Sequence, residues 1–196
     1  MIRLLFAALA VTLSACSNQV YSRGPLFTPE PIAAILRPGV WAAPDQACRF
    51  DPAQPLAAWP DCAHGQAIEQ GQALWEAKSA RLTLAAGEPM ILQLQAARRP
   101  RETWYYALAP LRRDQAGRVV ELETWAVLCG PPPPPRIEAD GDSHEDSVTH
   151  HPLPGLHVSG RNCLARRPDP IRDAARLSRG WDDDPTRAYW VRDGAR

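Results

Sequence analysis

The sequence predicts a mainly β domain of the α+β class, in which an antiparallel meander forms a small barrel or a sandwich and one helix lies near the C-terminus. Three observations lead to this prediction. Short segments rich in β-branched and aromatic residues alternate with turns between residues 80 and 129. A single helical pattern with signals at both ends follows residue 168. Four cysteines lie between residues 48 and 163, as expected for a small domain held by two disulfides.

The first residues have the order of a secretory signal. A positive charge at Arg3 precedes an apolar run from Leu4 to Leu13, and small residues follow. The run covers roughly ten residues, whereas a helix that crosses a bilayer needs about twenty. We therefore expect residues 1–15 to be removed as a signal peptide.

The stretch Leu13-Ser14-Ala15-Cys16 resembles the lipobox of bacterial lipoproteins, which signal peptidase II cuts before a diacylated cysteine. The alternative is an ordinary secretory signal with a chance cysteine near the cut. The resemblance implies that Cys16 becomes the mature N-terminus and carries diacylglycerol and an N-acyl chain such as palmitate. Two or more acyl chains hold a protein stably on a membrane. In this family an Asp after the cysteine often marks inner-membrane retention, and Ser17 stands here instead, which implies the periplasmic face of the outer membrane.

The next segment, residues 16–38, is rich in proline, serine and small residues. This composition predicts a flexible tether with a possible helical turn at Ile32–Leu36. Residues 39–196 are then a single periplasmic domain, which suits their number.

Strand candidates inside this domain follow from alternation and from the turns between them. The segment 66–76 fits neither period and stays open between a short helix and a strand. In the longest candidate, 118–128, Val120 and Leu122 lie on one face, whereas Glu121, Glu123 and Trp125 lie on the other. The candidates are residues 39–42, 47–50, 81–84, 91–95, 103–108, 118–128 and 188–191.

A proline-rich and acidic loop is expected at residues 131–152. Pro131 to Pro135 favour polyproline II, and the polar stretch after them reads as an exposed excursion. The helix comes later, with Asp169 as its cap, Pro170 at its first position and Gly180 at its end. Its buried face would carry Ile171, Ala174, Ala175 and Ser178.

Four cysteines, Cys48, Cys62, Cys129 and Cys163, remain once Cys16 is assigned to the anchor. Sequence order favours the local pairs Cys48–Cys62 and Cys129–Cys163, although four cysteines allow three pairings. Each loop would add roughly 3 kcal/mol through the unfolded chain. A zinc site is the weaker interpretation, because the sequence has no C-x-x-C pair.

Candidates for chemistry are few. The formal charge is +0, which indicates no nucleic-acid partner. Glu121 and Glu123 could act as paired carboxylates, but a solvated sheet face is the simpler interpretation. Neither a P-loop nor a serine nucleophile elbow is present. The residues of the loop that could in principle bind a metal, yet match no known ligand spacing, are Asp140, Asp142, His144, Glu145, Asp146, His150 and His151.

Aromatic residues are spread over most predicted strands, and core packing explains them most simply. The tripeptide Gly39-Val40-Trp41 resembles the Gly-x-Trp that opens the first strand of lipocalins, a family of β-barrel carriers. This resemblance implies a β-barrel fold. A carrier function would in addition require an apolar cavity, which we would expect among Trp41, Trp104 and Trp125.

The expected function is therefore a lipid-anchored envelope lipoprotein with a non-catalytic binding or structural accessory role. Its partners would be the bilayer, through acylated Cys16, and an unidentified envelope protein. We expect no catalytic residue, metal site or cofactor. A lipocalin-like carrier of a small apolar ligand is the first alternative, and a metal-dependent hydrolase is the second.

Overall fold

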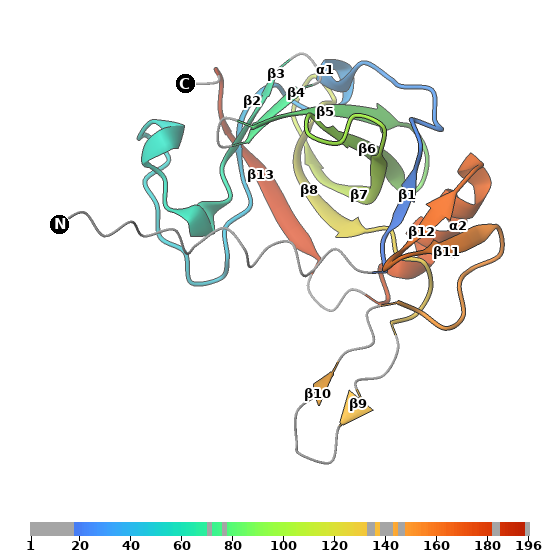
Figure 1. Cartoon of the computed structure of the whole chain (residues 1–196). Coiled ribbons are helices and arrows are strands. Elements are labelled where there is room, and N and C mark those ends of the chain that lie inside the picture. The colour runs from blue at the N-terminus through green and yellow to red at the C-terminus, as the bar shows by residue number, and fades with distance from the viewer. Residues whose placement is uncertain are drawn as a thin grey trace.

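The computed structural model describes residues 18–69, 72–75, 78–132, 136–137, 143–144, 148–181 and 185–194. Its strands form one eleven-stranded mixed sheet and a separate two-stranded ladder (Figure 1). The elements are β1 (Val20–Ser22), α1 (Ile32–Ile35), β2 (Gly39–Ala42), β3 (Gln66–Glu69), β4 (Gln72–Trp75), β5 (Lys78–Ala85), β6 (Met90–Ala96), β7 (Thr103–Arg113), β8 (Val119–Ala126), β9 (Arg136–Ile137), β10 (Ser143–His144), β11 (Leu156–Ser159), β12 (Asn162–Ala165), α2 (Pro168–Ser178) and β13 (Thr186–Arg192).

Eight strands form a ring of antiparallel pairings, which runs from β7 through β6, β5, β4, β3, β2, β13 and β8 and returns to β7. The sheet branches at β7. Tyr21 of β1 pairs with Trp104 near the start of that strand, whereas the pairing with β8 includes Tyr106 and Ala126. The sheet is therefore not a regular barrel, because β7 pairs with β1 as well as with β6 and β8, and the strands β1–β12–β11 extend away from the ring.

One hydrophobic cluster occupies the inner face of the ring. Because side chains alternate along a strand, paired residues such as Leu82 and Leu94 point to the same side. The short helix α1 covers one end of the ring, where Leu36 pairs with Val119. The buried members of this inner cluster are Ile32, Leu36, Trp41, Ile68, Leu82, Leu84, Met90, Leu108, Val119, Leu122 and Ala188.

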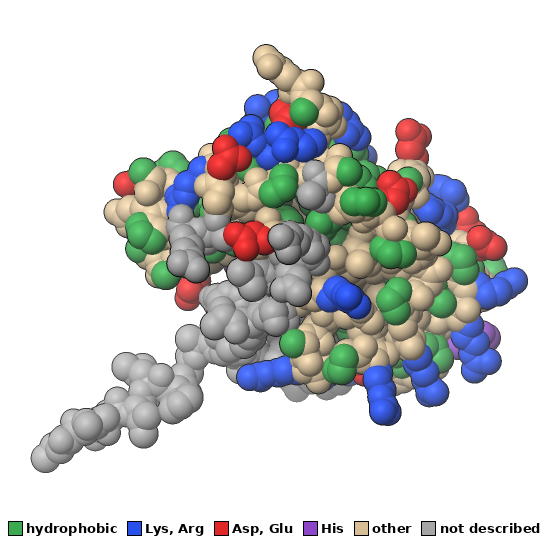
Figure 2. Space-filling model, turned by 90° about the horizontal axis from the view of Figure 1, so that it is seen from above, with side chains coloured by type: hydrophobic (Ala, Val, Ile, Leu, Met, Phe, Trp, Pro, Cys, Tyr) green, Lys and Arg blue, Asp and Glu red, His purple; other side chains and the backbone are tan. Residues whose placement is uncertain are grey.

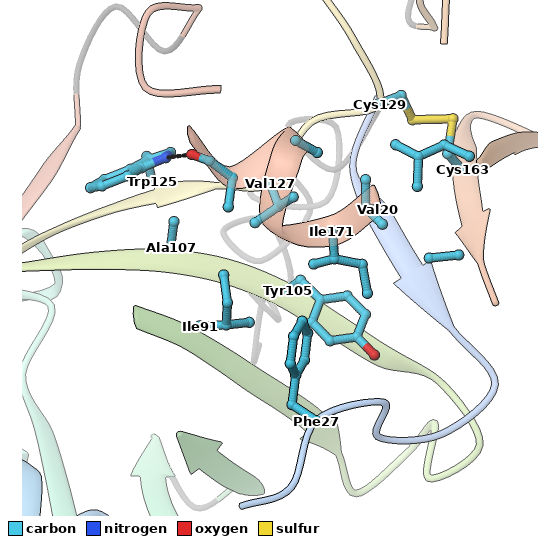
Figure 3. Packing of buried hydrophobic residues seen from close by; sticks show 14 of the residues in the cluster. Val20, Phe27, Ile91, Tyr105, Ala107, Trp125, Val127, Cys129, Cys163 and Ile171 are labelled. Atoms are coloured by element: carbon cyan, nitrogen blue, oxygen red, sulfur yellow. Dashed lines mark hydrogen bonds between the residues drawn. A yellow bond between two sulfur atoms is a disulfide. The ribbon is translucent and has the colours of Figure 1, made fainter. Parts of the chain in front are cut away.

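A second cluster lies on the other face of β6, β7 and β8, beneath α2 and β1 (Figure 3). Ile171, Ala174 and Ala175 of α2 are fully buried there. The indole nitrogen of Trp125 donates to the carbonyl oxygen of Ala175 at 2.9 Å. This carbonyl belongs to the last turn of the helix, where backbone acceptors lack partners inside the helix. The contact therefore ties the end of α2 to β8.

The predicted fold class is confirmed: the protein is mainly β, with an antiparallel meander, one C-terminal helix and the disulfides Cys48–Cys62 and Cys129–Cys163. The alternation along 118–128 is also confirmed, and the open segment 66–76 contains β3 and β4. The helix begins earlier than predicted, at Pro168, and no side chain caps it, so Asp169 lies within its first turn.

The predicted tether is wrong for residues 18–38. Val20 is fully buried in β1, Phe27 packs in the outer cluster, and Ile32 and Leu36 lie in the inner one. The folded body therefore includes residue 18 and does not begin at residue 39. Proline content suggested an extended chain, but the apolar residues between the prolines bury it against the sheet.

Two smaller predictions also differ from the structure. Residues 47–50 form no strand; the turn that closes with Cys48 N donating to Asp45 O leads into an irregular loop. The strand predicted at 103–108 extends to Arg113 as β7. Within the predicted loop 131–152, β9 and β10 pair with each other, and residues 133–135, 138–142 and 145–147 lie outside the described residues.

Candidate functional site

Every polar atom of Asn18, the first described residue, takes part in a hydrogen bond. Its backbone N–H donates to Arg161 O at 2.7 Å, and its carbonyl accepts from Cys129 N at 2.7 Å. Its side-chain amide donates to Gly130 O at 3.0 Å and accepts from Thr149 N at 3.0 Å. The residue is 5% exposed and has a φ of 63°, a conformation that asparagine tolerates better than most residues. Asn18 therefore holds three distant segments of the chain together.

The two residues after Asn18 are fixed as well. Cys163 N donates to Gln19 O at 2.9 Å, and Val20 N donates to Val127 O at 2.8 Å. The Cys129–Cys163 disulfide joins the segments on which these bonds depend. Figure 3 shows this disulfide beside Val20. The beginning of the described chain is thus an integral part of the sheet.

An aromatic pair lies beside this region. Tyr21 stacks on Trp104 with ring centroids 5.3 Å apart, and its hydroxyl is 2.9 Å from Ser159 Oγ. Trp104 pairs with Leu94 on the inner face of the ring, and both side chains are only partly buried. This end of the inner face is therefore apolar and partly open, in contrast to the end that α1 covers.

Tyr105 anchors the same strand on the opposite face. Its hydroxyl lies 2.5 Å from Ser22 Oγ, which in turn donates to Gly24 O. Burial raises the pKa of Tyr105 above its ordinary value of 10.0, and hydrogen bonds with Ser22 and the backbone of Leu26 lower it in part. The hydroxyl therefore serves as a buried structural donor.

The described surface also has a hollow of about 270 Å³ beside α1. Its two charged residues are already engaged: Glu30 Oε1 accepts from Ala86 N at 3.1 Å, and Arg113 donates to Gly117 O at 2.8 Å. The remaining lining is small or apolar, so the hollow presents no pair of groups for acid–base chemistry.

The two carboxylates of β8, Glu121 and Glu123, are each paired with an arginine rather than with each other. Glu121 is paired with Arg112 at 3.2 Å, and Glu123 is paired with Arg179 at 2.6 Å. Each carboxylate thus has its own cation at the sheet surface. The expected solvated sheet face is nevertheless wrong, because the side chains of Glu121 and Glu123 are only 27% and 17% exposed. The same face of β8 carries Trp125, which packs beneath α2.

The predicted metal candidates are not brought together within the described structure. Asp140, Asp142, Glu145 and Asp146 lie outside the described residues, and only the backbone of His144 is described, in β10. Among the side chains that can be placed, no three His, Cys, Asp or Glu residues are grouped as metal ligands. Lipid attachment at Cys16 falls outside the described residues too.

The three tryptophans of the carrier hypothesis do not surround one space. Trp41 lies in the inner cluster and is 1% exposed, and Trp104 lies on the inner face. Trp125 belongs to the outer cluster beneath α2. The cavity expected among these three residues is therefore absent, and any apolar site would involve the inner face alone.

Charges of both signs are interspersed on the face shown in Figure 2. This distribution agrees with the formal net charge of +0 and lacks the basic stripe of a nucleic-acid interface on that face. None of the helices in the described part of the chain has the length and apolar character that a bilayer crossing requires. Comparison with known proteins found no matching family model, no matching curated protein and no matching solved structure.

Proposed function

We propose that the protein is a lipid-anchored lipoprotein of the bacterial cell envelope with a non-catalytic binding or structural accessory role. The observation that carries this proposal is the lipobox-like stretch Leu13-Ser14-Ala15-Cys16, which directly precedes the folded body. Two disulfides support it, because such bonds persist in oxidising compartments such as the periplasm. By the same resemblance, Ser17 favours the outer membrane.

Acylation of Cys16 is tested by feeding cells a clickable fatty acid and weighing the N-terminal peptide of the purified protein. We expect the peptide to begin at Cys16 with diacylglycerol and an N-acyl chain. The Cys16→Ser variant should incorporate no label and should keep residues 1–15, because signal peptidase II cuts before a diacylated cysteine. A mature chain that begins elsewhere, or an unmodified Cys16 in the membrane fraction, would contradict the proposal.

The accessory role is tested separately, by mild crosslinking in cells followed by capture from detergent-solubilised membranes. We expect one envelope protein to be captured in stoichiometric amount with the native chain. A monomeric protein that captures nothing reproducibly would remove the accessory role but leave the anchor untouched.

A carrier of a small apolar ligand is the second candidate. The partly open apolar end of the inner face, with Leu94 and Trp104, favours it. Native mass spectrometry of protein purified from its own membranes would reveal a bound lipid. Replacement of Leu94 by a charged residue should release it, and protein that carries no ligand would end this candidate.

A further inference from the structure

The length of chain between the proposed anchor and the folded body is very short. Only Ser17 separates Cys16 from Asn18. Two residues span at most about 7 Å, since an extended chain covers 3.3–3.6 Å per residue. A typical flexible tether of twenty residues would instead span about 25 Å on average.

The folded body could move further from Cys16 only if its first residues detached from the sheet, and this would break the sheet. Asn18 is 5% exposed and bonded to three segments, and Val20 is fully buried between β12 and Val127. Detaching Asn18 alone would leave the backbone donors and acceptors of Cys129, Gly130 and Thr149 without their partners. The attachment point is therefore rigid.

We define the anchor face as the exposed residues next to the partners of Asn18: Pro131, His150, His151, Gly160 and Arg161. Val158, 51% exposed on β11, adjoins it. The stacked pair of Tyr21 and Trp104 borders it, because Tyr21 bonds to Ser159. Tyrosine and tryptophan are enriched where proteins meet the headgroup layer of a bilayer.

We propose that the anchor face rests directly on the headgroup layer of the bilayer, so that the domain has one fixed side toward the lipid. This inference rests on acylation of Cys16, the proposed function. It also turns the partly open apolar end of the inner face, at Trp104, toward the membrane, while α1 lies at the far end of the ring.

The test compares two forms of the mature acylated chain on a protein-free supported bilayer of bacterial phospholipids. One form is native, and the other carries a flexible Gly-Ser linker of about twenty residues between Ser17 and Asn18. Neutron reflectometry measures the water gap between headgroups and protein. We expect a native gap of less than about 10 Å, and a gap about 25 Å wider in the linker variant.

The matched control carries the same linker after Arg196, which leaves the anchor length unchanged; its gap should equal the native one. Equal gaps in the native protein and the Ser17–Asn18 linker variant would overturn the inference, as would a wide native gap. If mass spectrometry finds Cys16 unmodified, the proposed function fails on its own. The orientation can then still be measured by coupling the Cys16 thiol to a maleimide lipid, since the other four cysteines are in disulfides.

Discussion

Two buried side-chain amides form hydrogen bonds with backbone groups of irregular segments, which have no strand partner. Asn18 is one, and Gln93 of β6, which is 1% exposed, is the other. The side-chain oxygen of Gln93 accepts from the N–H groups of Leu26 and Phe27 at 3.0 Å each. Its amide nitrogen donates to Phe27 O and Thr83 Oγ1. Buried backbone groups need partners, so Gln93 is what fastens the segment before α1 to the sheet.

The Gln93→Ala substitution should therefore destabilise the protein by about 3 kcal/mol, because it leaves several buried donors and acceptors unsatisfied. Trypsin should also cut faster at Arg23, which is exposed next to the released segment. Urea unfolding and limited proteolysis measure the two effects. Gln95→Ala is the matched control on the same strand, since Gln95 makes one weak exposed bond at 3.4 Å; equal losses in the two variants would refute this role of Gln93.

The strand candidate 91–95 gives the orientation of Gln93, but the sequence could not predict its burial. Alternation places Gln93 opposite Leu92 and Leu94, and a polar side chain on such a face is normally solvated. The partner that covers it is Phe27, at a sequence separation of 66 residues. The alternation of residues along one strand carries no information about a contact with a residue so distant in the sequence. The contacts of Asn18 with distant segments could not be predicted for the same reason.

The turn of the β7–β8 hairpin is held by one carboxylate, that of Asp114. Asp114 Oδ1 accepts from the N–H groups of Ala116 and Arg118, and its Oδ2 is 2.9 Å from the guanidinium of Arg118. Gly117, with a φ of 79°, supplies the left-handed residue that this turn requires. Desolvation raises the pKa of Asp114, but the hydrogen bonds and the charge of Arg118 outweigh it, so the pKa lies below its ordinary 3.8.

Because the folded state lowers this pKa, the ionised carboxylate stabilises the hairpin above pH 3.8, and the contribution is lost as the pH falls below that value. We expect Asp114→Ala to lower the thermal midpoint at pH 7, with a deficit that shrinks toward pH 3. Thermal unfolding monitored across this range measures it. The control, Asp173→Ala, removes an exposed helical ion pair with Arg176 and should change the midpoint little at any pH.

Elements with local signals were predicted best. The helix carries a proline at its start and an apolar face, and the structure confirms it as α2. A connection between the strand candidates 103–108 and 118–128 was predicted. The extension of β7 to Arg113 was not, because the charged residues there are typical of a loop. The strand predicted at Cys48 failed because the Cys48–Cys62 bond holds that segment in a loop instead.

The two disulfides differ in the length of chain that they close and in the elements that they join. Cys48–Cys62 closes a separation of 14 residues within one loop. Cys129–Cys163 closes 34 residues and links the segment just after β8 to β12, on either side of the excursion that contains β9 and β10. Local pairing was predictable from sequence order; the closing of the ring and the branch at β7 were not, because they depend on contacts between distant strands.

Loss of Cys129–Cys163 should cost about 4 kcal/mol and loss of Cys48–Cys62 about 3 kcal/mol, from the loop entropy of the unfolded chain. Paired serine substitutions in a chain expressed without residues 1–16, followed by urea unfolding, measure both. Only the first variant should also expose the Asn18 region to faster amide hydrogen exchange. Four reactive thiols in the parent protein would contradict both disulfides.

The pairing of the segment that begins at Asn18 also constrains the order in which the chain is synthesised, processed and folded. β1 pairs with β12, so Val20 can take its place beside Cys163 only after the chain has been synthesised beyond that residue. Until then, β1 has no β12 to pair with. The processing that we propose at Cys16 can therefore precede folding, and the pairing of β1 with β12 then fixes Asn18 in the sheet.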